Sequence, residues 1–310
     1  MDNEISKNQS KGASDLSNEN TFKIVDGRKY HNENNSIYFL PSDNEEIDRL
    51  HLQHYMQKNI YQRNFFAPVE HLLKQEGAKV LDVGTGAGSW LFEMAADYPK
   101  AKFIGVDISP IHSSHIKPNN AEIIKGNVVE RLPFDDNTFD YVFQRFLSPG
   151  IPENKWPFVI NELVRVVRPG GFLEVLDCEY KASTMGPATT KILDAVFVMF
   201  QEFGLDPNVC YKLQNYLKEN EQLHDVHCEI KKEIDTKDAE ELYKLYSKNY
   251  VIATKGFKSK LMSIMKISND EFDNLVEKMG EEYVKLKTFS PQVRVYAQKK
   301  TNYCDNLKFL

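Results

Sequence analysis

The stretch KVLDVGTGAGSW, residues 79–90, decides the fold of this chain. It begins with the apolar run Val80 to Val83, which is typical of a buried parallel strand. Three glycines follow at alternate positions, where the lack of a Cβ lets the backbone turn sharply beneath a ligand. They are Gly84, Gly86 and Gly88. Apolar residues then recur at helical spacing from Trp90 to Ala95, so the stretch predicts the strand, turn and helix that open a Rossmann-like fold.

The spacing of the glycines indicates which cofactor the turn holds. Dinucleotide-binding turns read G-x-G-x-x-G, whereas here the third glycine comes one residue early and Ser89 takes the sixth position. Asp82 lies two residues before the first glycine, where a carboxylate would repel a pyrophosphate but could hold an ammonium group. The free amides of the following helix favour a carboxylate. The pattern therefore favours a nucleoside cofactor with an amino-acid end, such as S-adenosylmethionine.

These residues resemble the class I S-adenosylmethionine-dependent methyltransferases, whose first motif is an acid followed by G-x-G-x-G. The resemblance implies that Asp107, which ends the apolar run 101–107, accepts hydrogen bonds from the ribose hydroxyls. It places Ile108 beside the adenine, and it places Asn127 and Val128 where the family contacts the base. An acid is usual at the position of Asn127, and its amide can still pair with the exocyclic amine.

A fourth predicted strand, Phe139 to Phe143, ends at three further site candidates: Gln144, Arg145 and Phe146. The carboxyl ends of strands face the ligand in such folds. Arg145 can offer two parallel donors to a carboxylate or carbonyl of the acceptor, with Gln144 beside it. Alternatively, both side chains close the sheet edge against a helical lid, and the sequence leaves the two interpretations open. Gln-Arg before Ile151, Pro152 and Trp156 resembles fungal-type members of the family.

The resemblance implies one set of cofactor-binding residues. They are Asp82, Gly84, Thr85, Gly86, Gly88, Asp107, Ile108, Asn127, Val128 and Gln144. Methyl transfer from a sulfonium releases a neutral thioether, so proximity and a water-poor site supply most of the catalysis, and a dedicated catalytic residue is optional. The candidates for such a residue, including a general base for an oxygen acceptor, are His54, His112, Glu174, Gln144 and Arg145.

The expected fold class is α/β, with a Rossmann-like, seven-stranded, mostly parallel sheet. Residues 1–20 are almost entirely polar and predict a disordered tail. Residues 21–75 predict an N-terminal helical cover over the cofactor, in which Tyr38, Arg49 and His54 could line the pocket. Residues 76–180 form the cofactor-binding core, and residues 181–310 supply the remaining strands with helical lid insertions.

Within the C-terminal part, we expect helices over 189–220 and 239–265, with a strand over 224–235 between them. The apolar stripe of the first helical region predicts packing in a core or between subunits. Ser268 and Glu271 form a capping box for a helix that runs towards Lys287. The segment QVRVYAQKK, residues 292–300, alternates as an edge strand does and would be the reversed seventh strand of the family.

Composition narrows the function further. The 310 residues are 41% apolar and carry a net charge of −6 with both signs mixed, which favours a globular chain and disfavours nucleic acid as a partner. No run is long enough to span a membrane and no signal peptide opens the chain, so we expect cytoplasm or nucleus. The four cysteines and three H-x-x-H pairs lack the contexts of metal sites, so we expect no metal.

The sequence thus predicts an S-adenosylmethionine-dependent methyltransferase that acts on a small-molecule acceptor. A regulatory protein with the same fold, acting through protein partners, is the alternative from a different class, and a homodimer is left open. An aminopropyl transferase is disfavoured, because such enzymes carry an acid inside the glycine turn, where this chain has Thr85 and Ala87.

Overall fold

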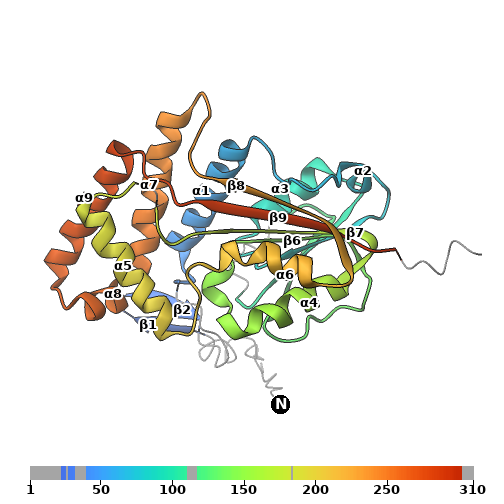
Figure 1. Ribbon diagram of the computed structural model, residues 1–310, viewed down its shortest axis with the longest axis horizontal. Coiled ribbons are helices and arrows are strands. Elements are labelled where there is room, and N and C mark those ends of the chain that lie inside the picture. The colour runs from blue at the N-terminus through green and yellow to red at the C-terminus, as the bar shows by residue number, and fades with distance from the viewer. Residues whose placement is uncertain (1–21, 26, 32–39, 110–116, 183, 302–310) are drawn as a thin grey trace, which may run out of the picture.

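The sheet order of the chain is that of the predicted class I fold. The computed structural model describes residues 22–25, 27–31, 40–109, 117–182 and 184–301. Seven strands form one sheet in the order β5-β4-β3-β6-β7-β9-β8, and only β9 runs antiparallel to its neighbours (Figure 1). Their bounds are β3 Lys79–Val83, β4 Lys102–Asp107, β5 Ala121–Lys125, β6 Phe139–Arg145, β7 Val167–Cys178, β8 Leu223–Lys231 and β9 Gln292–Lys299.

Helices cover both faces of this sheet. On one face lie α2 (Glu70–Leu73) and α3 (Ser89–Asp97), whose apolar side chains Trp90, Leu91 and Met94 are buried. On the other face lie α4 (Trp156–Val166) and α6 (Leu213–Glu219). Short 3-10 turns at Ser148–Gly150, Glu153–Lys155 and Val209–Tyr211 connect these elements. The result is the three-layer arrangement of a doubly wound α/β fold.

A second lobe of helices lies beyond the carboxyl ends of the parallel strands (Figure 1). It consists of α1 (Asn44–Tyr61), α5 (Pro187–Glu202), α7 (Ala239–Gly256), α8 (Lys258–Met265) and α9 (Asn269–Lys285). These helices share an apolar core of their own, which includes the stripe predicted on α5. That stripe is therefore core packing, and the capping box of Ser268 and Glu271 is also present at the start of α9.

The N-terminal segment contains the helices α1 and α2, and it also contains a hairpin that the sequence does not predict. A two-stranded hairpin, β1 (Phe22–Val25) with β2 (Arg28–His31), precedes α1. Arg28 of the hairpin donates to Asp43, which is the N-cap of α1, through Nη2 at 2.8 Å. The hairpin is thus tied to the helix start by an ion pair, a long-range contact that local sequence patterns do not contain. The predicted tail, residues 1–20, lies outside the described residues.

Residues 292–299 form β9, the reversed strand that the sequence predicts, but the prediction that it lies at the edge of the sheet is wrong. β9 lies between β7 and β8, and β8 forms the edge of the sheet. The alternation of polar and apolar residues reflects two buried faces of different character. Val293 and Val295 pack in the apolar core, whereas Gln292 and Arg294 are buried on the opposite face, where Arg294 lies 3.5 Å from the Glu174 carboxylate.

Candidate functional site

The glycine turn after β3 opens onto a pocket at the carboxyl ends of the strands. Its three glycines have φ angles of 73°, 54° and 79° at Gly84, Gly86 and Gly88, in the left-handed region that favours glycine. Gly84 and Gly86 line the pocket. A Cβ on Gly84 would lie 2.8 Å from the Leu147 side chain, so the turn cannot carry a larger residue without displacing the pocket wall.

Asp82 presents a buried carboxylate to this pocket. It lies in the centre of β3, 4% exposed, and accepts a hydrogen bond of 2.7 Å from the Thr85 hydroxyl. Burial is the main cause that raises the pKa of Asp82 to about 6, and the Thr85 hydrogen bond and the charge of Arg145 offset part of that effect. No cation forms a salt bridge with Asp82 among the described residues. A ligand ammonium would supply the missing positive charge, so the site fits the amino-acid end of S-adenosylmethionine.

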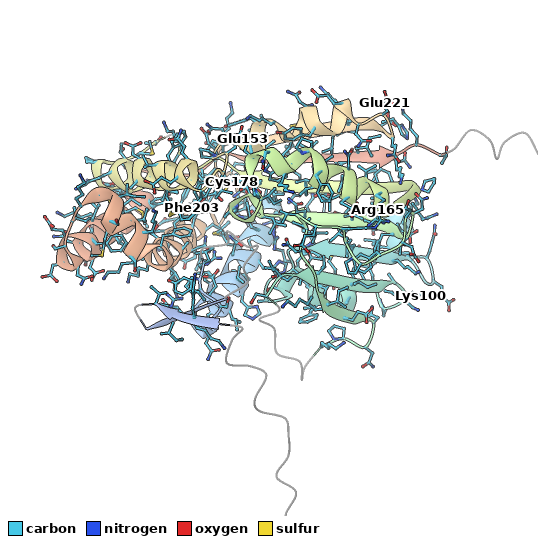
Figure 2. All side chains as sticks on the ribbon, turned by 90° about the horizontal axis from the view of Figure 1, so that it is seen from below. Lys100, Glu153, Arg165, Cys178, Phe203 and Glu221 are labelled. Carbon is cyan, nitrogen blue, oxygen red and sulfur yellow. The ribbon has the colours of Figure 1, made fainter. Side chains whose placement is uncertain are left out.

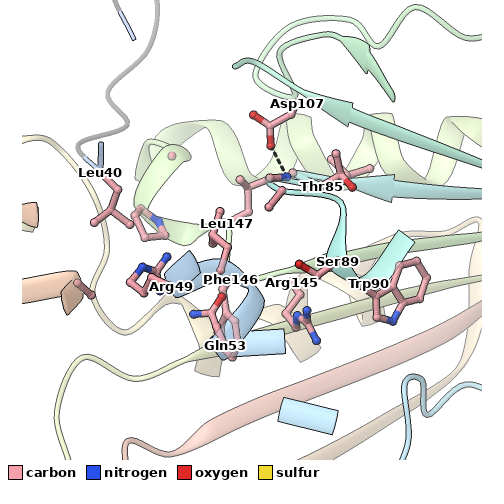
Figure 3. A pocket seen from close by; sticks show the side chains of 18 of the residues that line it. Leu40, Arg49, Gln53, Thr85, Ser89, Trp90, Asp107, Arg145, Phe146 and Leu147 are labelled. Atoms are coloured by element: carbon pink, nitrogen blue, oxygen red, sulfur yellow. Dashed lines mark hydrogen bonds between the residues drawn. The ribbon is translucent and has the colours of Figure 1, made fainter. Parts of the chain in front are cut away.

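Asp107 ends β4 and holds the glycine turn in place. One carboxylate oxygen accepts a hydrogen bond from the Gly86 backbone N–H at 2.8 Å, and the other accepts one from Ser109 N–H at 3.0 Å (Figure 3). Burial raises the pKa of Asp107, and the backbone hydrogen bonds partly offset this. The remaining lone pairs of the carboxylate are available to two ligand hydroxyls.

The other predicted cofactor contacts lie around the same pocket. Ile108, Asn127 and Val128 line it, and so does Thr85. The Asn127 side-chain oxygen accepts a hydrogen bond from Val129 N–H at 3.2 Å, which leaves its amide nitrogen for other partners. Acid, turn and apolar residues predicted from separate strands thus converge at the point where the strand order reverses between β3 and β6, as ligand sites do in this class of fold.

Arg145 brings a positive charge into the pocket. It ends β6 and lines the pocket, and no described carboxylate forms a salt bridge with it. Its Nη2 lies 3.2 Å from Nδ1 of His54, and Nε2 of His54 lies 2.6 Å from the Glu93 carboxylate. Burial, followed by the charge of Arg145, lowers the pKa of His54 to about 4. The neutral ring of His54 therefore accepts a hydrogen bond from Arg145 and donates one to Glu93, and these bonds fix the orientation of the Arg145 guanidinium.

Comparison with known proteins agrees with this geometry. Residues 80–171 match the family described as "Methyltransferase domain". The match is confined to these residues, which include the glycine turn and the strands β4, β5 and β6. The chain is 33% identical over 156 residues to Methyltransferase pytC of Aspergillus terreus, covering 50% of this chain and 46% of that protein. It is 31% identical over 157 residues to Secondary metabolism regulator laeA of Coprinopsis cinerea, covering 50% of this chain and 39% of that protein.

The chain thus spans less than half the length of these two relatives. Among solved structures, it is similar to Haemonchus contortus phosphoethanolamine N-methyltransferase 2 in complex with phosphomonomethylethanolamine and S-adenosylhomocysteine. That similarity has a TM-score of 0.48 and 16% identity, and it covers 81% of this chain and 58% of the other. The assignment of the methyltransferase domain rests on the family match, the glycine turn and the order of the seven strands.

Several residues predicted for the site do not line the pocket. Gln144 is fully buried and does not line the pocket, and neither amide atom has a hydrogen-bond partner. Glu174 accepts hydrogen bonds from the backbone N–H groups of Phe66 and Ala67 and from the Tyr141 hydroxyl, so it anchors the chain between α1 and α2. Gly88 is the N-cap of α3 and does not line the pocket.

Three of the predicted candidates cannot be placed in the pocket. His54 lies behind Arg145, and both of its ring nitrogens are engaged, so its surroundings favour a positioning role. His112 and Tyr38 lie outside the described residues. No histidine from the described ranges lines the pocket, so a general base of that type is not among its described lining residues.

An inner compartment extends from the glycine turn towards the helical lobe. We define it by the pocket residues contributed by α1, α7 and the ends of β6, β7 and β9, together with Leu40. They are Leu40, Arg49, Met56, Gln57, Phe146, Cys178, Tyr180, Tyr246, Asn249, Tyr250, Phe257 and Gln292. Figure 2 places Cys178 at the end of β7, between the strands and the helices of the lobe. The sequence analysis anticipated only Arg49 and Phe146 here, although tyrosines four residues apart on α7, Tyr246 and Tyr250, were a usable signal.

Arg49 is the one inner-compartment residue whose charge is fully matched by protein. It donates to the Glu46 carboxylate through Nε at 2.8 Å and Nη2 at 2.6 Å, and to the Asn249 side chain through Nη1 at 3.0 Å. The network links α1 to α7 and is buried throughout. Arg49 therefore holds the lobe over the pocket, and its place in the lining agrees with the prediction.

The other expectations concern membranes, metals and thiols. Within the described ranges, no helix combines the length and apolar character needed to cross a membrane. The same residues contain no group of three or more acidic, histidine or cysteine side chains placed to bind a metal ion. Cys178, Cys210 and Cys228 are free thiols, and Cys304 lies outside the described residues.

Proposed function

We propose that the chain is an S-adenosylmethionine-dependent methyltransferase that transfers a methyl group to a small-molecule acceptor. The observation that carries this proposal is a single pocket with two ends. Asp82 and Asp107 lie at one end, beside the glycine turn, and the inner compartment lies at the other. Such a pocket can hold the cofactor and an acceptor side by side.

The residues of the first end have separate roles. The Asp82 carboxylate would hold the ammonium of the cofactor, and Asp107 would accept hydrogen bonds from its ribose hydroxyls. Ile108 and Val128 would flank the base, with Asn127 at its edge. When bound, S-adenosylmethionine supplies an activated methyl group on a sulfonium. The chain supplies the alignment of that group with the acceptor.

Arg145 has an orienting role in this proposal. Its guanidinium, directed by neutral His54, can bind a carboxylate or carbonyl of a ligand in the middle of the pocket. The acidic groups of the inner compartment stay protonated, because burial raises the pKa of the Cys178 thiol and of the Tyr250 hydroxyl well above their ordinary values. The compartment therefore favours proximity and exclusion of water over proton abstraction as the source of rate.

A small acceptor is favoured over a macromolecule by the helices that line the pocket and by the charge of the chain. Residues from α1 and α7 line the inner compartment, and Tyr30 of the hairpin donates to the Gly256 carbonyl at 3.0 Å. A net charge of −6 disfavours nucleic acid. A location in the cytoplasm or nucleus and a homodimer remain predictions from the sequence.

A regulatory role through protein partners is the second candidate. The similarity to Secondary metabolism regulator laeA favours this role, because that relative is named as a regulator. Gly86→Arg would fill the glycine turn and block the cofactor. A binding partner captured equally by wild type and Gly86→Arg, without any turnover by wild type, would support the regulatory role.

The methyltransferase activity is tested by product release. Purified chain would be incubated with S-adenosylmethionine and fractionated small-molecule extracts, and S-adenosylhomocysteine would be measured by mass spectrometry. We expect release above background in at least one fraction, and loss of that release in Gly86→Arg. Equal release by wild type and variant in every fraction would contradict the proposal.

A further inference from the structure

Two arginines are among the described residues that line the pocket, and they differ in their partners. Arg49 is paired with the Glu46 carboxylate, whereas Arg145 forms no ion pair with any carboxylate in the described part of the chain. The one hydrogen bond of the Arg145 guanidinium there joins Nη2 to Nδ1 of His54 at 3.2 Å. Its Nε and Nη1 make none, and neither atom is fully buried. These N–H groups are therefore open to a ligand in the pocket.

The Arg145 guanidinium is held in one orientation by its neighbours. Its central carbon lies 5.9 Å from the centre of the Phe143 ring, and that ring stacks on Trp90 with the two centres 4.1 Å apart. His54 fixes the group through its hydrogen bond with Nη2. Figure 3 shows Arg145 among the lining side chains, next to Trp90 and Phe146. A cation fixed in this way loses little freedom when it binds a ligand.

Glu93 does not supply a counter-charge to Arg145, although it is linked to it through His54. The Glu93 carboxylate forms an ion pair with Lys58, and it accepts further hydrogen bonds from His54 at 2.6 Å and from the Asn64 side chain at 2.8 Å. Its negative charge is thus already balanced by a lysine on α1. The link through His54 orients the Arg145 guanidinium without neutralising it.

The charges nearest to Arg145 leave it short of a partner. Burial is the main cause that lowers the pKa of Arg145 to about 10; the charge of Asp82 offsets part of this effect, and the positive charge of Arg294 adds to it. In the proposed function the ammonium of the cofactor pairs with Asp82. Arg145 is then a partly buried cation without a counter-charge, a costly arrangement. The loaded site therefore favours a second ligand that carries a negative charge.

The carboxylate of the cofactor has other donors available. Ala87 and Ser89 line the pocket at the start of α3, and neither backbone N–H makes a hydrogen bond within the described residues. The start of a helix also favours a negative charge through the helix dipole. With the cofactor carboxylate at these amides, the charge of Arg145 remains for the acceptor.

We infer that the methyl acceptor carries a carboxylate, which the Arg145 guanidinium binds through the N–H groups that His54 leaves free. This inference deepens the proposed function and rests on it. Arg145 binds and orients the acceptor and selects for its charge. It takes no proton from the acceptor, because the guanidinium stays protonated at neutral pH.

The inference is tested by fluorescence titration of two matched probes against the full chain saturated with S-adenosylhomocysteine. The probes are 2-naphthoate and 2-naphthamide, which differ only in the replacement of the carboxylate by a neutral amide. Their rings suit a pocket that is lined by Phe146, Tyr250 and Phe257. We expect 2-naphthoate to bind at least about tenfold more tightly, because hydrogen bonds between two charged groups are stronger than those to a neutral carbonyl.

Variants of Arg145 locate the origin of this preference. In Arg145→Gln the preference for 2-naphthoate should fall to about twofold or less, and Arg145→Lys, which keeps the charge without the planar fork, should lie between. Arg63→Gln is the matched control, because it removes an exposed arginine that does not line the pocket, and it should keep the full preference. The midpoint of urea unfolding shows whether each variant is folded. The preference of wild type tests the inference without any variant.

A second cofactor analogue distinguishes the acceptor carboxylate from that of the cofactor. 5′-Methylthioadenosine lacks the amino-acid end, so it leaves Asp82 unpaired and able to attract Arg145. The preference for 2-naphthoate should therefore be greater with S-adenosylhomocysteine than with 5′-methylthioadenosine. If Arg145 bound the cofactor carboxylate instead, S-adenosylhomocysteine would occupy it and the order would be reversed.

The results separate this inference from the proposed function. The inference would be overturned by equal affinity for both probes, by no measurable binding of 2-naphthoate, by the reversed order of the two cofactor analogues, or by an unchanged preference in folded Arg145→Gln. Binding of S-adenosylhomocysteine would leave the proposed function standing in each case. Failure of S-adenosylhomocysteine to bind wild type would instead remove the proposed function and this inference with it.

Discussion

Replacement of Asp107 by alanine should weaken cofactor binding by about two orders of magnitude. In the proposed site the Asp107 carboxylate accepts hydrogen bonds from two ribose hydroxyls, in addition to those that it accepts from the backbone N–H groups of Gly86 and Ser109. Hydrogen bonds to charged groups contribute about 1.5–3 kcal/mol each, so the two ribose bonds account for about 3 kcal/mol or more. Since 1.4 kcal/mol is about tenfold in affinity, Asp107→Ala should raise the Kd about 100-fold.

Isothermal titration calorimetry with S-adenosylhomocysteine measures this change directly. Asp107→Asn keeps an acceptor oxygen without the charge and should lie between wild type and Asp107→Ala. Asp136→Ala removes an exposed acid that does not line the pocket and should bind as wild type does. The ribose assignment would be refuted by an Asp107→Ala variant that folds and binds within about threefold of wild type.

Three further predictions concern carboxylates that are hydrogen-bonded within the chain. Cofactor affinity should fall by up to about tenfold per pH unit as pH drops through about 6. The reason is that Asp82, whose pKa is raised to about 6, becomes protonated there and no longer attracts the ammonium group. The affinity of Asp82→Asn, measured by calorimetry, should not show this pH dependence. Glu174→Leu should lower the free energy of unfolding, measured in urea, by about 3–5 kcal/mol, because it leaves Arg294 and two backbone N–H groups without their acceptor. A decrease below about 1 kcal/mol would contradict this role. Gly186→Ala should lower the midpoint of urea unfolding, because its Cβ would lie 2.1 Å from the Glu282 carboxyl carbon and break that carboxylate's hydrogen bonds to α5; an unchanged midpoint would contradict this.

The sheet was predictable from the sequence because its signals are local. The apolar run before Gly84 marks a strand, and the acid at Asp107 marks the end of another. The hairpin β1–β2 and the interior place of β9 were not predicted. Both depend on partners far along the chain, such as Arg28 with Asp43 and Arg294 with Glu174, and local periodicity carries no information about these pairs.

The cofactor end of the site could be predicted and the acceptor end could not. Asp82, the glycine turn and Asp107 follow strands in a fixed order, so their sequence positions determine their places at the sheet edge. Met56, Tyr246 and Gln292 line the inner compartment from elements that meet only after the lobe has folded onto the sheet, and none of them has a motif around it. Only the structure brings them to one pocket.

Calorimetric titration of the wild-type chain with S-adenosylmethionine, and separately with NADH, tests the central claim most directly. The turn of Gly84, Gly86 and Gly88 behind Asp82 predicts one site per chain with micromolar affinity for S-adenosylmethionine and no heat with NADH. No binding of S-adenosylmethionine by folded protein, or binding of NADH at the same site, would contradict the account.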